Sequence, residues 1–146
     1  MSFPTPQNGL VISYSYLWRD EARKGLVEGR KNRPCAILLL VQNPEGGKPT
    51  VTVAPITHTL PADPSVAIEI PATVKAYLKL DGDRSWAVLD DLNVFIWPGY
   101  DLAPVPNTKD RYDYGLLPSK LHRQMLDNVI ELRQPGRASP TPRDDD

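Results

Sequence analysis

Arg33 is the residue that its neighbours place best for binding a phosphate group. It belongs to the segment Lys31-Asn32-Arg33-Pro34, which directly precedes the longest apolar run of the chain, residues 35–41. A rigid proline and a buried strand on its C-terminal side would hold its guanidinium group in place. A guanidinium binds phosphate oxygens through two parallel hydrogen bonds. The alternative is that these basic residues form an ordinary solvated loop.

Thr57 and His58 form a second candidate site. They lie in the segment Ala54-Pro-Ile-Thr57-His58-Thr59, directly after an expected strand at residues 50–54. A hydroxyl group there can contact a phosphate, and an imidazole can transfer a proton near neutral pH. The alternative is a threonine-rich turn in which the hydroxyl groups satisfy backbone groups.

A third polar group interrupts two apolar segments. Asp90 and Asp91 stand between residues 85–89 and residues 93–97. Adjacent acids at such a joint often make only a bulge or a turn. Asn93 has apolar neighbours, so we expect its amide to be buried, and a buried amide must find hydrogen-bond partners.

Several common kinds of site are not indicated by the sequence. One cysteine and two separate histidines give no recognised zinc spacing, and the carboxylates show no calcium-loop pattern. No glycine-rich phosphate loop follows a strand, and there is no nucleophile elbow. We therefore expect neither a metal nor a cofactor.

The elements expected to position these residues are short strands and two helices. Residues 43–49 are dense in turn-forming types and predict a hairpin between the second and third strands. The pattern predicts a mostly β fold with minor α, a small barrel closed by a C-terminal helix. Strands are predicted over residues 10–17, 35–41, 50–54, 66–70, 85–89 and 93–97, and helices over residues 72–78 and 117–132.

A chain of 146 residues is of the usual size for one domain. We place that domain at residues 9–132, after an N-terminal arm of residues 1–8. Residues 133–146 are rich in Pro, Gly, Ser and charges and have no apolar anchor, which predicts a disordered tail. Deletion of residues 134–146 is therefore expected to leave the fold intact.

The composition limits the classes of protein to which this chain can belong. The formal net charge is −1, so any nucleic-acid binding needs a local basic patch rather than bulk charge. The single Cys35 fits a reducing cytoplasm. No apolar run approaches the length of a membrane helix, and the N-terminus lacks the features of a signal peptide. We expect a soluble cytoplasmic protein.

Taken in order, these segments resemble the PemK/MazF family of toxins. The shared pieces are Gly9 with the strand after it, Arg33-Pro34 before the next strand, Val53-Ala-Pro-Ile-Thr57, and Val88-Leu-Asp-Asp91. The resemblance covers about residues 9–97, and the expected C-terminal helix fits as well. It implies an SH3-like barrel that forms a homodimer. It also implies that single-stranded RNA, or a segment of a cognate antitoxin protein, occupies a groove.

The resemblance further implies a metal-independent, sequence-specific endoribonuclease that leaves a 2′,3′-cyclic phosphate. Arg33 would stabilise the phosphorane, and Thr57 would donate a hydrogen bond to the phosphate. The acidic residue of the family maps to Asp91, which we prefer, or to Asp90. His58 replaces the small polar residue usual after the threonine and is a candidate acid or base of this chain alone.

The residues expected to contact RNA lie mostly in the loop before Arg33, which is longer than usual for the family. Of the two acids in this loop, Glu28 has the family's spacing, while Glu21 lies further back and is the alternative. The candidates for stacking on bases or contacting the backbone are Trp18, Glu28, Arg30, Lys31 and Asn93.

Two other functional classes stay open. A non-enzymatic poison of DNA gyrase, like the CcdB-type toxins, would share the fold. The chain ends in Arg143-Asp-Asp-Asp146 and not in the Trp-Gly-Ile ending of those toxins, which argues against this class. The other class is an inactive barrel that only binds a partner, and the presence of Arg33 and Thr57 argues against it.

Overall fold

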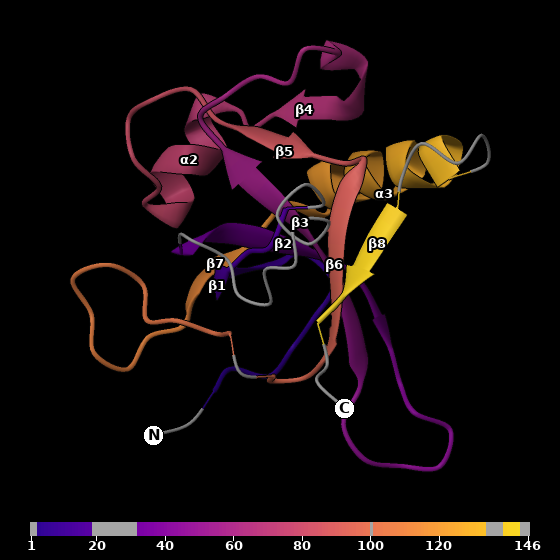
Figure 1. Cartoon of the computed structure of the whole chain (residues 1–146). Helices are drawn as coiled ribbons and strands as arrows, with labels where there is room; N and C mark the ends of the chain where they lie inside the picture. Colours follow the sequence, from indigo (N-terminus) through magenta and orange to yellow (C-terminus); the bar gives the residue numbers. More distant parts are fainter. Residues whose placement is uncertain (1–2, 19–31, 100, 134–138, 144–146) are drawn as a thin grey trace.

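The computed structural model describes residues 3–18, 32–99, 101–133 and 139–143. Over these ranges the chain is mostly β, as predicted (Figure 1). The strands are β1 Leu10–Ser15, β2 Asn32–Val41, β3 Thr50–Thr57, β4 Ala67–Glu69, β5 Trp86–Val88, β6 Asp91–Ile96, β7 Asp113–Leu116 and β8 Ser139–Pro142. The helices are α2 Ala72–Leu78 and α3 Ser119–Arg133, with a 3-10 turn, η1, at Pro64–Val66.

The described strands form one open sheet that branches at β3. The main order is β4-β5-β3-β2-β1-β7, while β6 pairs with β3 and with β8. β5 and β6 share one edge of β3, because β6 pairs with its first half and β5 pairs with Ile56 and Thr57 at its end. The pairs are antiparallel except for β6 with β8. The end of β3 therefore lies between β2 and β5.

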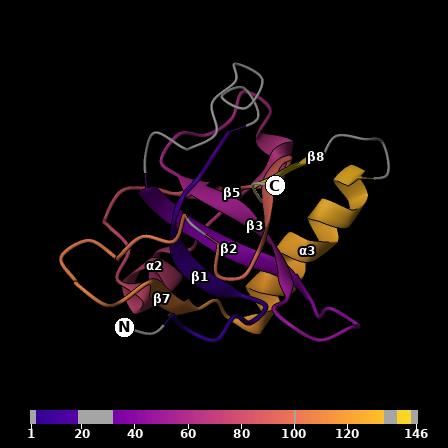
Figure 2. The ribbon, with the colours of Figure 1, turned by 60° about the horizontal axis from the view of Figure 1, so that its bottom comes forward.

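The alternation of side chains along the strands separates two apolar clusters. One face of the sheet packs against α2 and α3, which cover it in Figures 1 and 2. The inward face of α3 consists of Leu121, Met125, Val129 and Leu132, at the helical spacing that the sequence predicted. The opposite face of the sheet forms the second cluster, which includes Ile12, Tyr14, Cys35, Val53 and Phe95.

Strand β7 is an element that the sequence did not predict. It lies between the last predicted strand, residues 93–97, and the predicted helix over residues 117–132, and Gly115 within it has a φ of +119°. β7 pairs with β1 through a register shift between Val11 and Ile12. The partner strand, which lies about a hundred residues earlier in the chain, stabilises this short segment, and no local pattern reveals that pairing.

The predicted disordered tail is wrong for residues 139–143. β8 pairs with β6 in parallel, and the backbone N–H of Arg143 donates to Val94 O at 2.8 Å. The side chain of Arg143 is only 1% exposed. The prediction from composition failed because it assumed that arginine is solvated. The guanidinium of Arg143 instead donates to buried acceptors on distant segments.

Candidate functional site

A pocket of about 400 Å³ opens at the end of β3. It gathers several residues that the sequence singled out, although they lie far apart in the chain. Continuing the β2–β3 register beyond Cys35 and Pro55 places Arg33 opposite Thr57. Opposed residues of antiparallel strands present their side chains on the same face. The pocket is lined by Trp18, Arg33, Thr57, Thr59, Pro61, Val88, Asp90 and Asp91.

The guanidinium of Arg33 is held in this pocket by stacking. Its central carbon lies 5.1 Å from the centroid of the Trp18 ring. Its Nε is buried and has no hydrogen-bond partner among the described residues. A buried N–H group without a partner costs about 1–3 kcal/mol. The guanidinium as a whole lines the pocket, and its planar set of N–H groups suits an anionic oxygen. Arg33 therefore presents a donor suited to a phosphate.

Two buried hydrogen bonds between the side chain of Asn93 in β6 and the backbone of Leu17 position Trp18. Asn93 Oδ1 accepts from Leu17 N at 3.0 Å, and Asn93 Nδ2 donates to Leu17 O at 2.8 Å. Asn93 was predicted to contact RNA, but it is 0% exposed and its amide is already bonded within the protein. The structure corrects that assignment, because Asn93 fixes the backbone directly before Trp18.

The two acids at the start of β6 differ in their surroundings. Tyr16 donates its hydroxyl proton to the backbone oxygen of Asp91 and, at 2.9 Å, to Asp91 Oδ1. Burial raises the pKa of Tyr16 well above its usual value, and the charge of Asp91 adds to this effect, so the phenol stays protonated. Asp91 is 8% exposed, whereas Asp90 is half-buried. Both residues line the pocket, and Asp90 is the more accessible to a ligand.

Thr57 combines both roles that the sequence left open. Its hydroxyl oxygen accepts a hydrogen bond from the backbone N–H of Thr59 at 3.2 Å, as in a threonine turn. A hydroxyl group that accepts one bond can still donate its own proton. Since the side chain lines the pocket, this proton is a second donor for a ligand that contacts Arg33.

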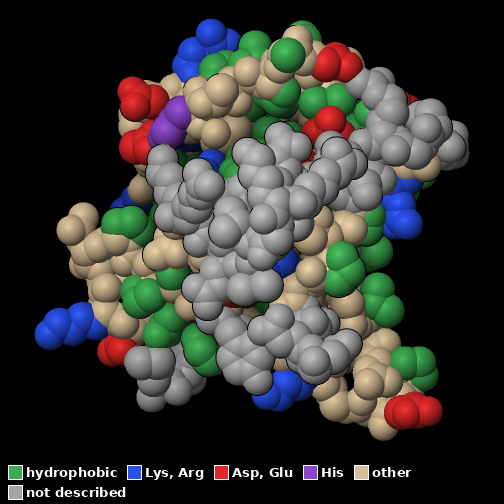
Figure 3. Space-filling model, viewed as in Figure 1, with side chains coloured by type: hydrophobic (Ala, Val, Ile, Leu, Met, Phe, Trp, Pro, Cys, Tyr) green, Lys and Arg blue, Asp and Glu red, His purple; other side chains and the backbone are tan. Residues whose placement is uncertain are grey.

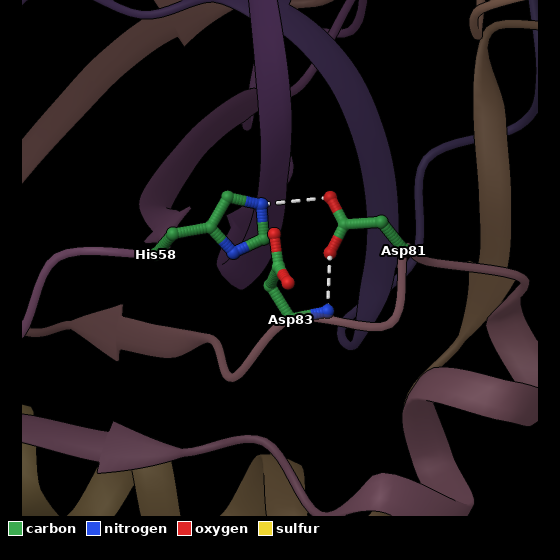
Figure 4. Close-up of side chains that lie close together, drawn as sticks. All are labelled: His58, Asp81 and Asp83. Atoms are coloured by element: carbon green, nitrogen blue, oxygen red, sulfur yellow. Dashed lines mark hydrogen bonds and ion pairs between the residues drawn. The ribbon is translucent and has the colours of Figure 1, made fainter.

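His58 lies on the other side of the strand end and is not part of the pocket lining. Its Nε2 lies 2.7 Å from Asp81 Oδ2 (Figure 4). Its Nδ1 lies 3.0 Å from Arg84 O. His58 follows the last residue of β3, and its ring is bonded to residues 81 and 84 rather than to the pocket lining. The structure does not bring His58 to Arg33.

His58, Asp81 and Asp83 place their ligand atoms within 4.8 Å of one another, a cluster that the sequence reasoning missed (Figure 4). Nε2 of His58 faces a carboxylate oxygen of Asp81, while its Nδ1 lies 3.0 Å from Arg84 O and 3.2 Å from the hydroxyl oxygen of Ser85. The buried Lys75 also places its Nζ 3.4 Å from Asp81 Oδ1. Burial by itself raises the pKa of Asp81, but the hydrogen bonds from His58 and Lys75 outweigh it and lower the pKa. The contacts describe a hydrogen-bonded network rather than a metal centre.

Four residues of the predicted RNA-contacting loop, Glu21, Glu28, Arg30 and Lys31, lie outside the described residues. Over the described part of the face in Figure 3, basic and acidic side chains are interspersed, in keeping with the small net charge. Among the described residues that line the pocket, the basic one is Arg33.

Within the described ranges, no helix is both long and apolar enough to cross a membrane.

Comparisons with known proteins do not identify the family of this chain. No protein-family model matches the chain, and no curated protein sequence matches it significantly.

Proposed function

We propose that this chain is a metal-independent endoribonuclease that cleaves single-stranded RNA, the toxin of a toxin–antitoxin pair of the PemK/MazF type. The observation that carries the proposal is the pocket in which Arg33 and Thr57 meet Trp18 and the two acids at the start of β6. The mostly β architecture with its closing helix is compatible with the SH3-like barrel of that family, and the barrel is part of the proposal.

The reaction needs little more than positioning, because RNA carries its own nucleophile. The 2′-hydroxyl attacks the adjacent phosphorus, the bond to the 5′-oxygen breaks, and a 2′,3′-cyclic phosphate and a 5′-hydroxyl remain. The protein must accept the proton of the 2′-hydroxyl, stabilise the added charge on the phosphorane, and return a proton to the departing oxygen.

Arg33 and Thr57 supply the charge stabilisation. The guanidinium group of Arg33 and the hydroxyl group of Thr57 belong to side chains that line one pocket before any ligand arrives. A preorganised donor of this kind is typically worth about 3 kcal/mol in the transition state. The ring of Trp18 offers a stacking surface for a neighbouring base, typically worth about 1–3 kcal/mol.

We assign the proton transfers to Asp90 rather than to Asp91, the residue favoured from the sequence. Asp91 is 8% exposed, whereas Asp90 is half-buried and therefore more accessible to a ligand in the pocket. Asp90 would accept the proton of the 2′-hydroxyl and then pass it, directly or through a water, to the departing 5′-oxygen. His58 has no part in this assignment, because its ring is bonded outside the pocket.

This assignment predicts different outcomes for the two acids. Asp90→Asn should lower the cleavage rate about 10²–10⁴-fold and leave the melting temperature unchanged. Asp91→Ala removes the side-chain acceptor of the buried Tyr16 hydroxyl, which keeps the backbone oxygen of residue 91, and should destabilise the fold by about 0.5–1.5 kcal/mol. Cleavage assays and thermal melts of both variants check this. If Asp90→Asn cleaves like the parent while Asp91→Asn is inactive and stable, Asp91 is the acceptor.

The function itself predicts cleavage in the presence of a chelator. A long unstructured RNA incubated with the purified protein and excess EDTA should be cut at discrete positions, because the proposed chemistry uses only protein side chains and the 2′-hydroxyl. Mapping of the RNA ends provides the readout. Loss of cleavage on chelation that magnesium restores would overturn the mechanism.

We also propose that the protein forms a homodimer and that a cognate antitoxin protein binds it. An antitoxin segment that binds the pocket would compete with RNA for Arg33 and Trp18. A small open reading frame beside the gene is the simplest indication of such a partner, and inhibition of RNA cleavage by its product is the test.

A further inference from the structure

Trp86 lies on the pocket face of the sheet, next to Thr57. The β3–β5 register pairs Thr57 with Trp86, and the β4–β5 register pairs Trp86 with Glu69. Side chains of paired residues lie on one face, so these three residues form a row across β3, β5 and β4. Val88, two residues after Trp86 and thus on the same face, lines the pocket itself. The row therefore lies on the same face of the sheet as the pocket and begins at Thr57, which lines it.

Arg84 is fixed above the ring of Trp86. Its central carbon lies 5.0 Å from the ring centroid, within the range of a cation–π contact. Its Nε and Nη2 donate to the two carboxylate oxygens of Glu69 at 2.9 and 2.8 Å. This bidentate pair holds the guanidinium plane in one orientation, and yet the side chain of Arg84 is 72% exposed.

Because Arg84 is exposed, its ion pair with Glu69 contributes little to the stability of the fold. Ion pairs exposed to solvent usually contribute only about 0–1 kcal/mol. The same arrangement is well suited to a nucleobase, because indole and guanidinium planes are the surfaces on which unpaired bases stack. It also repeats the pairing of Arg33 with Trp18 on the other side of Thr57.

We propose that Trp86 and Arg84 form a second nucleotide-binding subsite for single-stranded RNA, adjacent to the pocket of Arg33 and Thr57. The inference rests on the proposed ribonuclease function and extends it. Neighbouring strands lie about 4.8 Å apart, so a phosphate at Thr57 and a base at Trp86 belong to the same or to adjacent nucleotides. The RNA would then run from Trp18, past Arg33 and Thr57, to Trp86.

The test measures binding and cleavage separately. The binding probe is a fluorescein-labelled seven-nucleotide RNA that contains a mapped cleavage position, with a 2′-O-methyl group at the cleaved ribose so that it stays intact. Fluorescence anisotropy is compared for the parent, Trp86→Ala, Trp86→Phe and Arg84→Ala. Tyr77→Ala serves as the control, because Tyr77 is a 74% exposed aromatic residue on α2, outside this row. Cleavage of the unmodified RNA gives kcat and KM.

We expect Trp86→Ala to weaken binding about tenfold or more, as the loss of one stacked base does. KM should rise by a similar factor while kcat changes little. Trp86→Phe should recover most of the affinity, Arg84→Ala should lose several-fold, and Tyr77→Ala should match the parent. Since Arg84 is exposed, its variant should fold even if Trp86→Ala does not.

Two failures are distinguishable. If the parent binds and cleaves RNA while folded Trp86→Ala or Arg84→Ala binds the probe as tightly as the parent, the second subsite is disproved and the ribonuclease function stands. If the parent cleaves no RNA, no cleavage position can be mapped; the proposed function is then wrong, and the subsite is wrong with it.

Discussion

Arg33→Ala should reduce RNA cleavage at least 10²–10³-fold, roughly the effect of removing one preorganised donor to a transition-state anion. The melting temperature should change little. Arg33 is half-buried, its Nε–H has no partner among the described residues, and its stacking on Trp18 contributes only about 0.5–1 kcal/mol. Cleavage rates and thermal melts of purified parent and variant measure the two effects independently.

Companion variants separate a catalytic role from a structural one. Arg33→Lys should also be poor, because an ammonium group cannot reproduce two parallel hydrogen bonds. Thr57→Ala should be impaired, and the double variant should be less than multiplicatively worse, since groups acting on one phosphate are not additive. Arg123→Ala is the matched control, because its side chain is 77% exposed on α3. Cells that express Arg33→Ala at the parent's level and suffer the same toxicity would disprove the assignment of the site.

Arg143→Ala should destabilise the fold by about 3–5 kcal/mol, the usual cost of removing one partner from a buried ion pair. Nη2 of Arg143 donates to Asp101 Oδ2 at 2.7 Å, and Nη1 donates to Asn93 Oδ1 at 2.7 Å and to Ser15 O at 3.0 Å. Without the guanidinium, these acceptors lose their buried donors. Thermal or urea unfolding measures the loss, and a fall in melting temperature of roughly 10 °C or more is expected.

A truncated chain and a surface variant test whether Arg143 stabilises the fold. Deletion of residues 139–146 should destabilise the fold to a similar extent, which is the opposite of the outcome expected from the sequence alone. Arg123→Ala, which breaks only an exposed pair with Asp127 at 3.5 Å, should change stability by less than about 0.5 kcal/mol. A folded Arg143→Ala variant that melts with the parent would show that β8 and its arginine do not support the fold.

The sequence could predict the elements whose pattern is local. The bounds of α2 matched residues 72–78, and the buried face of α3 followed from its helical spacing. The proximity of Arg33 and Thr57 could also be anticipated, because they flank the two strands of one hairpin. A hairpin brings the residues at its open end together, although a bulge between Ile37 and Leu39 shifts the register of this one.

The remaining features depend on contacts between distant segments. The rule that a buried amide needs partners held for Asn93, but the partners are Leu17 and Arg143 and not RNA. The place of Trp86 beside Thr57 follows from the pairing of β3 with β5, which no local pattern specifies. Likewise, the ring of His58 is turned from the pocket by residues that lie more than twenty positions later in the chain.

The most direct test of the proposed chemistry replaces a single hydroxyl group in the substrate. An RNA oligonucleotide carrying a mapped cleavage position is compared with one that has a 2′-deoxyribose only at the cleaved nucleotide, both in excess EDTA. If the 2′-hydroxyl is the nucleophile, the unmodified RNA yields a 2′,3′-cyclic phosphate end and the deoxy substrate stays intact at that position. Cleavage at the deoxy position would contradict the mechanism, because the attacking group would then have to come from water or from the protein.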